Sequence, residues 1–212
     1  MIETLTKLID FALHIDKHLS ILVQNYGAGV YFILFFIVFL ETGLVITPFL
    51  PGDSLLFISG TFAAAGIMDI VVLFFVFTIA GILGDGFNFW LASNFGVKLF
   101  EKSKLFKKEH LERTRKFYKL HGGKTIVIAR FLPIIRTFAP FVAGIAKMDY
   151  KKFLFYNIIG GILWVSTFLF VGYLFGNIPI VQQNLMLVTL VIIVVSLIPA
   201  FVEFLRHRMR KK

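Results

Sequence analysis

Long apolar runs separated by short polar breaks occupy most of the chain. Three of them, residues 70–95, 153–175 and 185–204, are long enough to cross a bilayer core, which needs about 20 apolar residues of helix. Residues 2–23 instead place apolar side chains at spacings of three and four, opposite charged ones, which is typical of an amphipathic helix lying in the membrane interface. The pattern therefore predicts an all-α integral membrane protein with amphipathic interfacial helices.

Two further apolar stretches are interrupted in the middle. In residues 28–66 the second apolar run, of about a dozen residues, is too short to span the bilayer, and residues 125–146 are split into halves that cannot span singly. The helix-breaking residues are Pro48, Pro51 and Gly52 in the first stretch, and Pro133 and Pro140 in the second. Irregular backbone at membrane depth is tolerated only where protein or a water-filled cavity covers it. We therefore expect two re-entrant hairpins in addition to three to four transmembrane helices.

An internal repeat relates the two halves of the chain. The triplet Phe-Leu-Pro at 49–51 recurs at 131–133, and Gly-Ile-Leu at 81–83 recurs at 161–163, followed in both halves by Phe-Gly. The expected organisation is an interfacial helix (1–26), a first repeat (27–96), a basic amphipathic linker (97–121), a second repeat (122–176), a final transmembrane helix (182–205) and a basic tail (206–212). With the basic segments placed on the cytoplasmic side, the two halves have opposite orientations in the membrane. The expected arrangement is therefore an inverted repeat, as in many secondary transporters.

Composition and charge support a membrane location. The chain is 58% hydrophobic with only 16% charged residues, and its net charge is +10. The basic residues gather at 98–124, 147–152 and 203–212, beside apolar segments, as expected of cytoplasmic loops that contact anionic lipid rather than of a nucleic-acid-binding face. The C-terminus and the second hairpin would then face the cytoplasm. We expect no cleavable signal peptide, and the absence of cysteine excludes disulfides and thiolate metal sites.

Charged residues inside the apolar stretches are the candidate functional site. They are Glu41 and Asp53 in the first broken stretch, and Arg130 and Arg136 in the second. An unpaired charge at the bilayer centre costs about 2.5 to 3.5 kcal/mol, so these residues are expected to face one another or a polar interior. Either they form buried ion pairs that only fix the packing of the helices, or they take part in the function of the protein. Asp85 either joins them or makes a hydrogen bond at a helix contact.

The residue types suit proton and phosphate chemistry. Burial raises the pKa of a carboxylic acid and a neighbouring arginine lowers it, so Glu41 and Asp53 are candidates for proton coupling. Arginine holds a phosphate through two parallel hydrogen bonds, so Arg130 and Arg136 are candidates for binding a lipid phosphate or for balancing the carboxylates. The pattern offers no catalytic residue, cofactor site or metal site, because no histidine lies in an apolar core segment and no hydrolase or metalloprotease motif is present.

Four stretches contain these residues: ETGLVITPFLPGDSLLF (41–57), GDGFNFWLASNFG (84–96), HGGKTIVIARFLPIIRTFAPFVAGIAKMDYKKF (121–153) and YNIIGGILW (156–164). In this combination the sequence resembles the DedA family of bacterial membrane proteins, which is related to the VTT or SNARE-associated membrane proteins. The resemblance implies paired re-entrant hairpins, a proton-dependent transporter or lipid translocase, and functional roles for Glu41, Asp53, Arg130 and Arg136. The family often has Gly-Arg where this chain has Ala92-Ser93, so a role for that arginine is not carried over.

The leading hypothesis is a multi-pass bacterial inner-membrane translocase that moves an anionic lipid, such as undecaprenyl phosphate or a phospholipid, between leaflets with protons as the coupling ion. Membrane lipids and protons are its expected partners, nucleic acid is not, and a homo-oligomer is left open. The alternatives are a proton-dependent ion or small-solute transporter that supports envelope homeostasis, an intramembrane enzyme acting on lipid phosphates, and a scaffold that would tolerate apolar residues at Glu41 and Arg136.

Overall fold

The described part of the protein is helical throughout. A computed structural model describes residues 15–44, 52–96, 122–179, 181, 187 and 191. The helices are α2 (Ile15–Tyr26), α3 (Val30–Gly43), α4 (Gly52–Ala64), α5 (Ile70–Leu91), α8 (Lys124–Ala129), α9 (Pro133–Ile145) and α10 (Tyr150–Phe175), with a 3₁₀ turn at Gly27–Gly29 and a π-helical turn at Ala92–Gly96. The described residues contain no strand.

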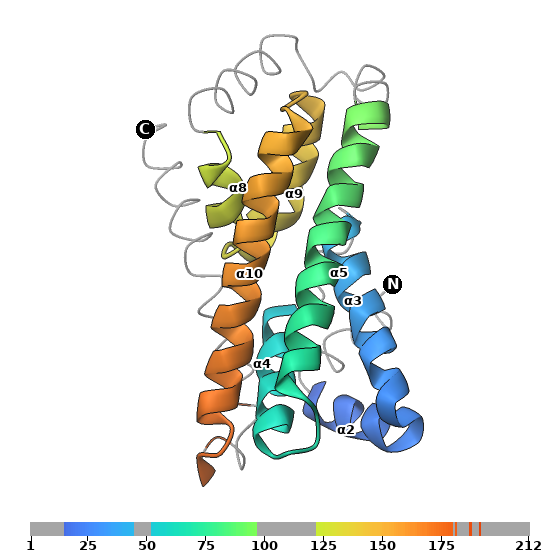
Figure 1. The fold of residues 1–212 in the computed structure, drawn as a ribbon, viewed down its shortest axis with the longest axis vertical. Coiled ribbons are helices and arrows are strands. Elements are labelled where there is room, and N and C mark those ends of the chain that lie inside the picture. Colours follow the sequence, from blue (N-terminus) through green and yellow to red (C-terminus); the bar gives the residue numbers. More distant parts are fainter. Residues whose placement is uncertain are drawn as a thin grey trace, which may run out of the picture.

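Two long helices, α5 and α10, run the length of the molecule in opposite directions (Figure 1). With 22 and 26 residues they are about 33 and 39 Å long, enough to cross a bilayer core of about 30 Å. Both begin at an aspartate N-cap, because Oδ1 of Asp69 accepts hydrogen bonds from the backbone of Val71 and Val72, and Oδ1 of Asp149 accepts one from Lys152. Both helices match the spans predicted from the sequence.

By length and composition, three helical stretches are apolar enough to cross a membrane: Lys17–Gly43, Ile70–Gly96 and Tyr150–Phe175. The first is not one straight rod, because Gly27 has a φ of +50° and α2 lies across the lower end of the molecule in Figure 1 while α3 rises from it. The molecule is therefore an all-α integral membrane protein. Four parts of the predicted organisation lie outside the described residues, apart from positions 187 and 191. They are the first 14 residues of the interfacial helix, the linker (97–121), the final transmembrane helix (182–205) and the tail (206–212).

Two pairs of short helices enter from opposite ends and meet at mid-height (Figure 1). In the first pair, α3 rises and α4 returns toward the start of α5, where the backbone N–H of Asp69 donates a hydrogen bond of 2.8 Å to the hydroxyl of Tyr31. In the second pair, α8 descends and α9 returns. Helices α3, α4 and α9 have 14, 13 and 13 residues, about 20 Å each, so none of them alone reaches across a bilayer core.

The prolines of the second pair act differently from each other. Pro133 is the first residue of α9, where its missing N–H removes no helical hydrogen bond. Pro140 was expected to break the hairpin, and that prediction is wrong, because α9 continues through Pro140 to Ile145. Helices at membrane depth tolerate proline where neighbouring groups compensate for the lost bond. Pro48 and Pro51 lie outside the described residues, and Gly52 is the first residue of α4.

Each short pair packs on both long helices, at points marked by small residues. Helix α3 lies along α5 and α4 lies along α10, whereas α8 lies on α10 and α9 on α5. A Cβ at Gly60 would collide with the backbone of Leu169, and one at Gly172 with the backbone of Phe57, so α4 and α10 are in close backbone contact. At the α9–α5 crossing, a Cβ at Gly144 would meet the side chain of Ala92 at 2.8 Å.

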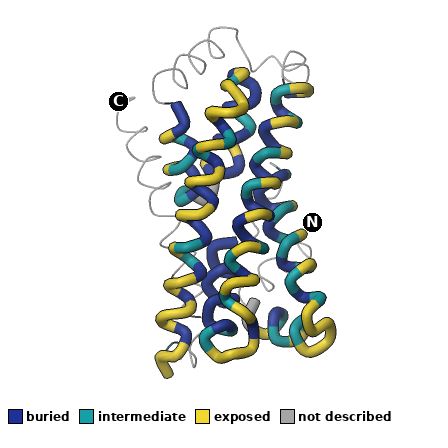
Figure 2. The backbone as a smooth tube through the Cα atoms, viewed as in Figure 1, coloured by how far each residue is buried: buried dark blue, intermediate teal, exposed yellow. Residues whose placement is uncertain are grey.

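Buried and exposed residues separate the inside of the bundle from its outside (Figure 2). Helix α4 is buried on nearly every side, whereas α3, α5 and α10 expose large apolar side chains outward, including Phe32, Phe75 and Leu174. A surface this apolar fits contact with lipid tails better than contact with water. Five charged residues, by contrast, are buried inside the bundle: Glu41, Asp53, Asp85, Arg130 and Arg136.

Candidate functional site

The tips of the short helices bring together three of the predicted residues. Glu41 lies in the last turn of α3, Asp53 in the first turn of α4 and Arg136 in the first turn of α9. Nη1 of Arg136 donates to Oδ1 of Asp53 at 2.7 Å, and Nη2 donates to Oε1 of Glu41. All three side chains are buried. This Arg136 cluster joins the two pairs of short helices through charge-assisted hydrogen bonds.

Each carboxylate of the Arg136 cluster also has a second donor. Oε1 of Glu41 accepts the backbone N–H of Gly52 at 3.0 Å, and Oδ1 of Asp53 accepts Nε1–H of Trp164 at 2.8 Å. Gly52 is required at the first position of α4 because a Cβ there would overlap the Glu41 carboxylate. Oε2 of Glu41 is buried and has no hydrogen-bond partner in the described part of the chain.

Arg130, the fourth predicted residue, belongs to a separate cluster. Its Nη2 lies 2.6 Å from Oδ2 of Asp85 and also donates to Oδ1 of Asn157 and to the carbonyl of Gly81 at 3.2 Å. Asn157 in turn donates to the carbonyl of Ile82 at 2.9 Å. The Arg130 cluster, made of Arg130, Asp85 and Asn157, therefore ties the end of α8 to both α5 and α10. Asp85 therefore joins the other charged residues as the ion-pair partner of Arg130, which is the first of the two roles expected for it.

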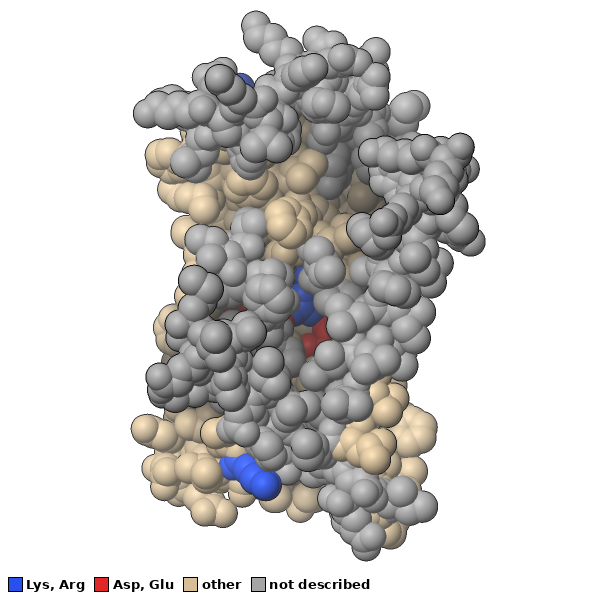
Figure 3. Space-filling model, turned by 180° about the vertical axis from the view of Figure 1, so that it is seen from behind, with Lys and Arg blue, Asp and Glu red and all other residues tan. Residues whose placement is uncertain are grey.

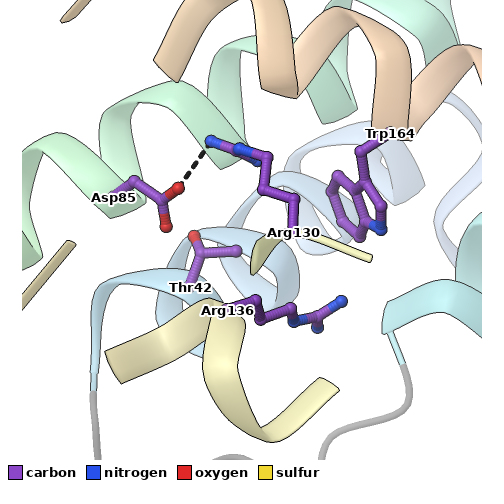
Figure 4. Close-up of a pocket in the computed structure, with 5 residues that line it drawn as sticks. All are labelled: Thr42, Asp85, Arg130, Arg136 and Trp164. Carbon is purple, nitrogen blue, oxygen red and sulfur yellow. Dashed lines mark ion pairs between the residues drawn. The ribbon is translucent and has the colours of Figure 1, made fainter. Parts of the chain in front are cut away.

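Trp164 of α10 lies between the two clusters (Figure 4). The Cζ atoms of Arg130 and Arg136 lie 5.9 and 5.1 Å from its ring centroid, within the range of cation–π attraction. The indole ring and both arginines line a cavity together with Thr42 and Asp85, which has about 180 Å³ of empty space, part of it open to the outside. Viewed from behind, basic and acidic atoms are visible next to one another at mid-height (Figure 3).

Helix ends add partial charges to this region. The N-termini of α4 and α9 carry partial positive charge, which favours Asp53 in the first turn of α4. Arg136 sits in the first turn of α9, where a cation is unfavourable unless anions surround it, and the two carboxylates supply them. Arg130 is the C-cap of α8, where a cation is favourable. The helix end therefore favours the positive charge of Arg130, whereas the positive charge of Arg136 depends on its two carboxylate partners.

Asn88 is a site residue that the sequence interpretation missed. Its fully buried side-chain amide donates to the carbonyl of Thr137 in α9 at 2.9 Å and to that of Thr42 in α3 at 3.3 Å. It therefore holds both hairpins against α5. A signal was available, because Asn88 follows Asp85 by three residues and so shares its helix face. Asn157 and Trp164 are likewise seven residues apart, on one face of α10.

Comparison with known proteins identifies the family. The VTT domain matches residues 50–174. Protein DedA of Escherichia coli K12 is 54% identical over 205 residues, which cover 95% of this chain and 94% of that protein. The chain belongs to the DedA family. Other DedA-family relatives include an uncharacterized membrane protein of Mycobacterium leprae, 43% identical over 78% of this chain and 75% of its own length, and the inner membrane protein YghB of E. coli K12, 36% identical over 82% and 78%. No solved structure matches.

Family membership and the apolar helices together make this DedA-family chain a multi-pass membrane protein. The matched domain includes Asp53, Asp85, Arg130 and Arg136, whereas Glu41 lies upstream of it. Among the described residues, no group of three histidine, aspartate or glutamate side chains is arranged to hold a metal ion. The chemistry that the site offers is ion pairing, hydrogen bonding to anions and proton exchange on carboxylates.

Proposed function

We propose that this DedA-family protein is a bacterial inner-membrane translocase that moves an anionic lipid, such as undecaprenyl phosphate or a phospholipid, between leaflets with proton coupling. The observation that carries the proposal is the pair of buried charge clusters at the tips of the short helices. Buried ion pairs contribute little to stability on balance, so a functional reason for five buried charges is the better explanation. YghB, a relative, is named an inner membrane protein, which supports the proposed location. The basic segments support a cytoplasmic C-terminus.

Corresponding contacts in the two halves support an inverted repeat of two re-entrant hairpins. Gly176, at the end of α10, packs against Thr61 of α4, and Gly96, at the end of the π-helical turn after α5, packs against Ile145 of α9. These two glycines are equivalent in the repeat seen in the sequence. The hairpins open at opposite ends of the molecule in Figure 1. Such a structure allows alternating access around a fixed central site, because one half rocks against the other.

The charge balance of the site supports proton coupling. Glu41, Asp53 and Asp85 carry three formal negative charges, whereas Arg130 and Arg136 carry two positive ones, so the fully ionised site has a net charge of −1. A phosphate entering this site would add further negative charge in a region of low dielectric. Uptake of a proton by a carboxylate offsets that charge. Oε2 of Glu41 is buried without a partner and is the proposed proton acceptor.

A proton-dependent ion or small-solute transporter is the second candidate function. The cavity favours it, because its enclosed space is about the size of one water molecule, far smaller than the headgroup of a lipid. The lipid hypothesis requires that the headgroup reach the clusters from the side while its tails stay in the bilayer. We propose transport rather than catalysis for both candidates, because each carboxylate of the two clusters is held in an ion pair with an arginine, and neither cluster contains a histidine to serve as acid or base.

The test is lipid movement in liposomes that contain the purified protein. Fluorescently labelled undecaprenyl phosphate and labelled phosphatidylethanolamine are compared, with and without a pH gradient. Glu41→Gln and Arg136→Ala should abolish movement, whereas Asp69→Asn, a change at the exposed cap of α5, should preserve it. Wild-type rates in both site variants would overturn the proposal. Movement of ions or small solutes without lipid would support the second candidate instead.

A further inference from the structure

We propose that Arg136 gives up its bonds to Glu41 and Asp53 and binds a phosphate group instead. During this exchange Trp164 acts as a positioning residue, because its indole N–H keeps Asp53 in place. The inference rests on the proposed function and deepens it, because it assigns different roles to the two arginines. Arg130 keeps its partners throughout the cycle. The ligand chemistry is a terminal phosphate group, from a lipid headgroup or from free phosphate.

The first argument is that both partners of Arg136 have a second donor. If Arg136 moves away, Oε1 of Glu41 keeps the backbone N–H of Gly52, and Oδ1 of Asp53 keeps the indole N–H of Trp164. A buried carboxylate without any partner is strongly unfavourable, so this second set of donors lowers the barrier to the exchange. The two donors come from α4 and α10, so they remain in place when α9 shifts.

The second argument is that Arg130 has no such freedom. Its side chain contacts Asp85 and Gly81 of α5 and Asn157 of α10, so its removal would break the polar contacts of α8 with both long helices at once. Asp85 would also lose its ion-pair partner. Arg130 is therefore a fixed cation beside the cavity, where its buried Nε has no hydrogen-bond partner within the described residues. A fixed positive charge next to a movable one suits the capture of an anion.

The third argument is the field at the exchange site. Arg136 lines the cavity, and the N-termini of α4 and α9 adjoin it, so backbone partial charges favour an incoming anion. A guanidinium binds phosphate and carboxylate through the same pair of parallel hydrogen bonds. Arg136 would therefore exchange two single bonds, one to Asp53 and one to Glu41, for two parallel bonds to one phosphate. A lysine at this position could not reproduce that match.

Trp164 also supplies the signal for a test. Its ring lies 5.1 Å from Cζ of Arg136, so departure of Arg136 changes the electrostatic surroundings of the indole. The chain has one other tryptophan, Trp90, which lies exposed on α5. In a Trp90→Phe protein in nanodiscs, the fluorescence of Trp164 is followed during titration with short-chain phosphatidic acid, with inorganic phosphate and with the matching diacylglycerol.

We expect a saturating change in emission with phosphatidic acid and none with diacylglycerol. A response to phosphatidic acid alone indicates a lipid ligand, whereas an equal response to inorganic phosphate indicates a soluble one. Arg136→Lys should weaken binding by about tenfold or more, whereas Asp69→Asn, at the exposed cap of α5 outside both clusters, should retain the response. No response to either phosphate, or an unchanged response in Arg136→Lys, would overturn the exchange.

The role of Trp164 is tested with Trp164→Phe, which keeps an aromatic ring but removes the N–H donor together with part of the buried ring. Calorimetric affinity for phosphatidic acid should fall about tenfold, the size expected for one buried hydrogen bond to a charged group, while Trp90→Phe should bind normally. In an Asp53→Asn background the same change should have little effect, because Trp164 acts through Asp53. An undiminished loss in that background would indicate a merely structural role and overturn the assignment.

The binding assay separates this inference from the proposed function. An Arg136-dependent response in a protein that moves no lipid would refute translocation and leave the exchange standing. Lipid movement in a protein that shows no Arg136-dependent response would refute the exchange and leave translocation standing.

Discussion

Gly52 offers a sharp test of the site, because a single methyl group added there meets the proposed proton acceptor. A Cβ at Gly52 would lie 2.7 Å from both Cδ and Oε1 of Glu41, whereas carbon atoms pack at about 3.5 to 4.0 Å. The carboxylate must therefore move by about 1 Å, which stretches its 3.0 Å hydrogen bond to Gly52 beyond hydrogen-bonding range. Its bond to Arg136 is displaced as well.

The magnitude follows from these contacts. Loss of one buried hydrogen bond to a charged group costs about 1.5 to 3 kcal/mol. Alanine returns up to about 0.5 to 1 kcal/mol through lower chain entropy, so Gly52→Ala should lose roughly 1 to 2 kcal/mol of stability and most translocation. Gly86→Ala is the matched control, because no atom lies within 4 Å of a Cβ at Gly86 and the helix should gain stability there.

Stability is measured by unfolding the purified proteins with sodium dodecyl sulfate, and lipid movement is measured in liposomes. The structure predicts that Gly52→Ala lowers stability and loses activity, whereas Gly86→Ala raises stability and keeps activity. A Gly52→Ala protein as stable and as active as the wild type would refute the close approach of Gly52 to Glu41, and with it the proposed donor arrangement.

Three further predictions concern the contacts around the site. Asn88→Leu removes two buried hydrogen bonds and should lower the unfolding free energy by about 1 to 3 kcal/mol, and an unchanged unfolding midpoint would contradict the clamp between hairpins. Asp85→Asn leaves Arg130 without a carboxylate and should destabilise by about 3 kcal/mol or more, whereas loss of an exposed cap costs about 1 kcal/mol. Gly172→Ala should prevent close packing of α4 on α10, so a normal thermal midpoint in detergent would refute that helix crossing.

The sequence predicted the long helices because their apolar length and their aspartate caps are local features. Helix α5 begins at Ile70 as expected, and α10 begins at Tyr150, three residues before the predicted start at 153, because Asp149 caps it. The positions of the two broken stretches were also predicted, because a charged residue or a proline inside an apolar run is visible in the chain itself. The re-entrant geometry and the inverted repeat stay predictions.

The pairing within the site could not be predicted, because it depends on which helix faces meet. Sorting the charges by sign grouped both arginines with Glu41 and Asp53, whereas the structure gives Arg130 to Asp85 on α5. Pro140 was misjudged for a related reason, since tertiary contacts decide whether a proline ends a helix at membrane depth. Trp164 was hidden because, in an apolar helix, a tryptophan that donates a hydrogen bond looks like one that faces lipid.

The packing of α4 on α10 has a consequence for biogenesis. Helix α4 ends at Ala64, but the helix that covers it begins only at Tyr150, so a ribosome must add more than eighty residues before that partner exists. At typical rates of synthesis this takes on the order of ten seconds. During that interval Asp53 lacks both Arg136 and Trp164. The nascent first hairpin therefore needs a polar shelter, from the insertion machinery or from the membrane surface, until the second half of the chain arrives.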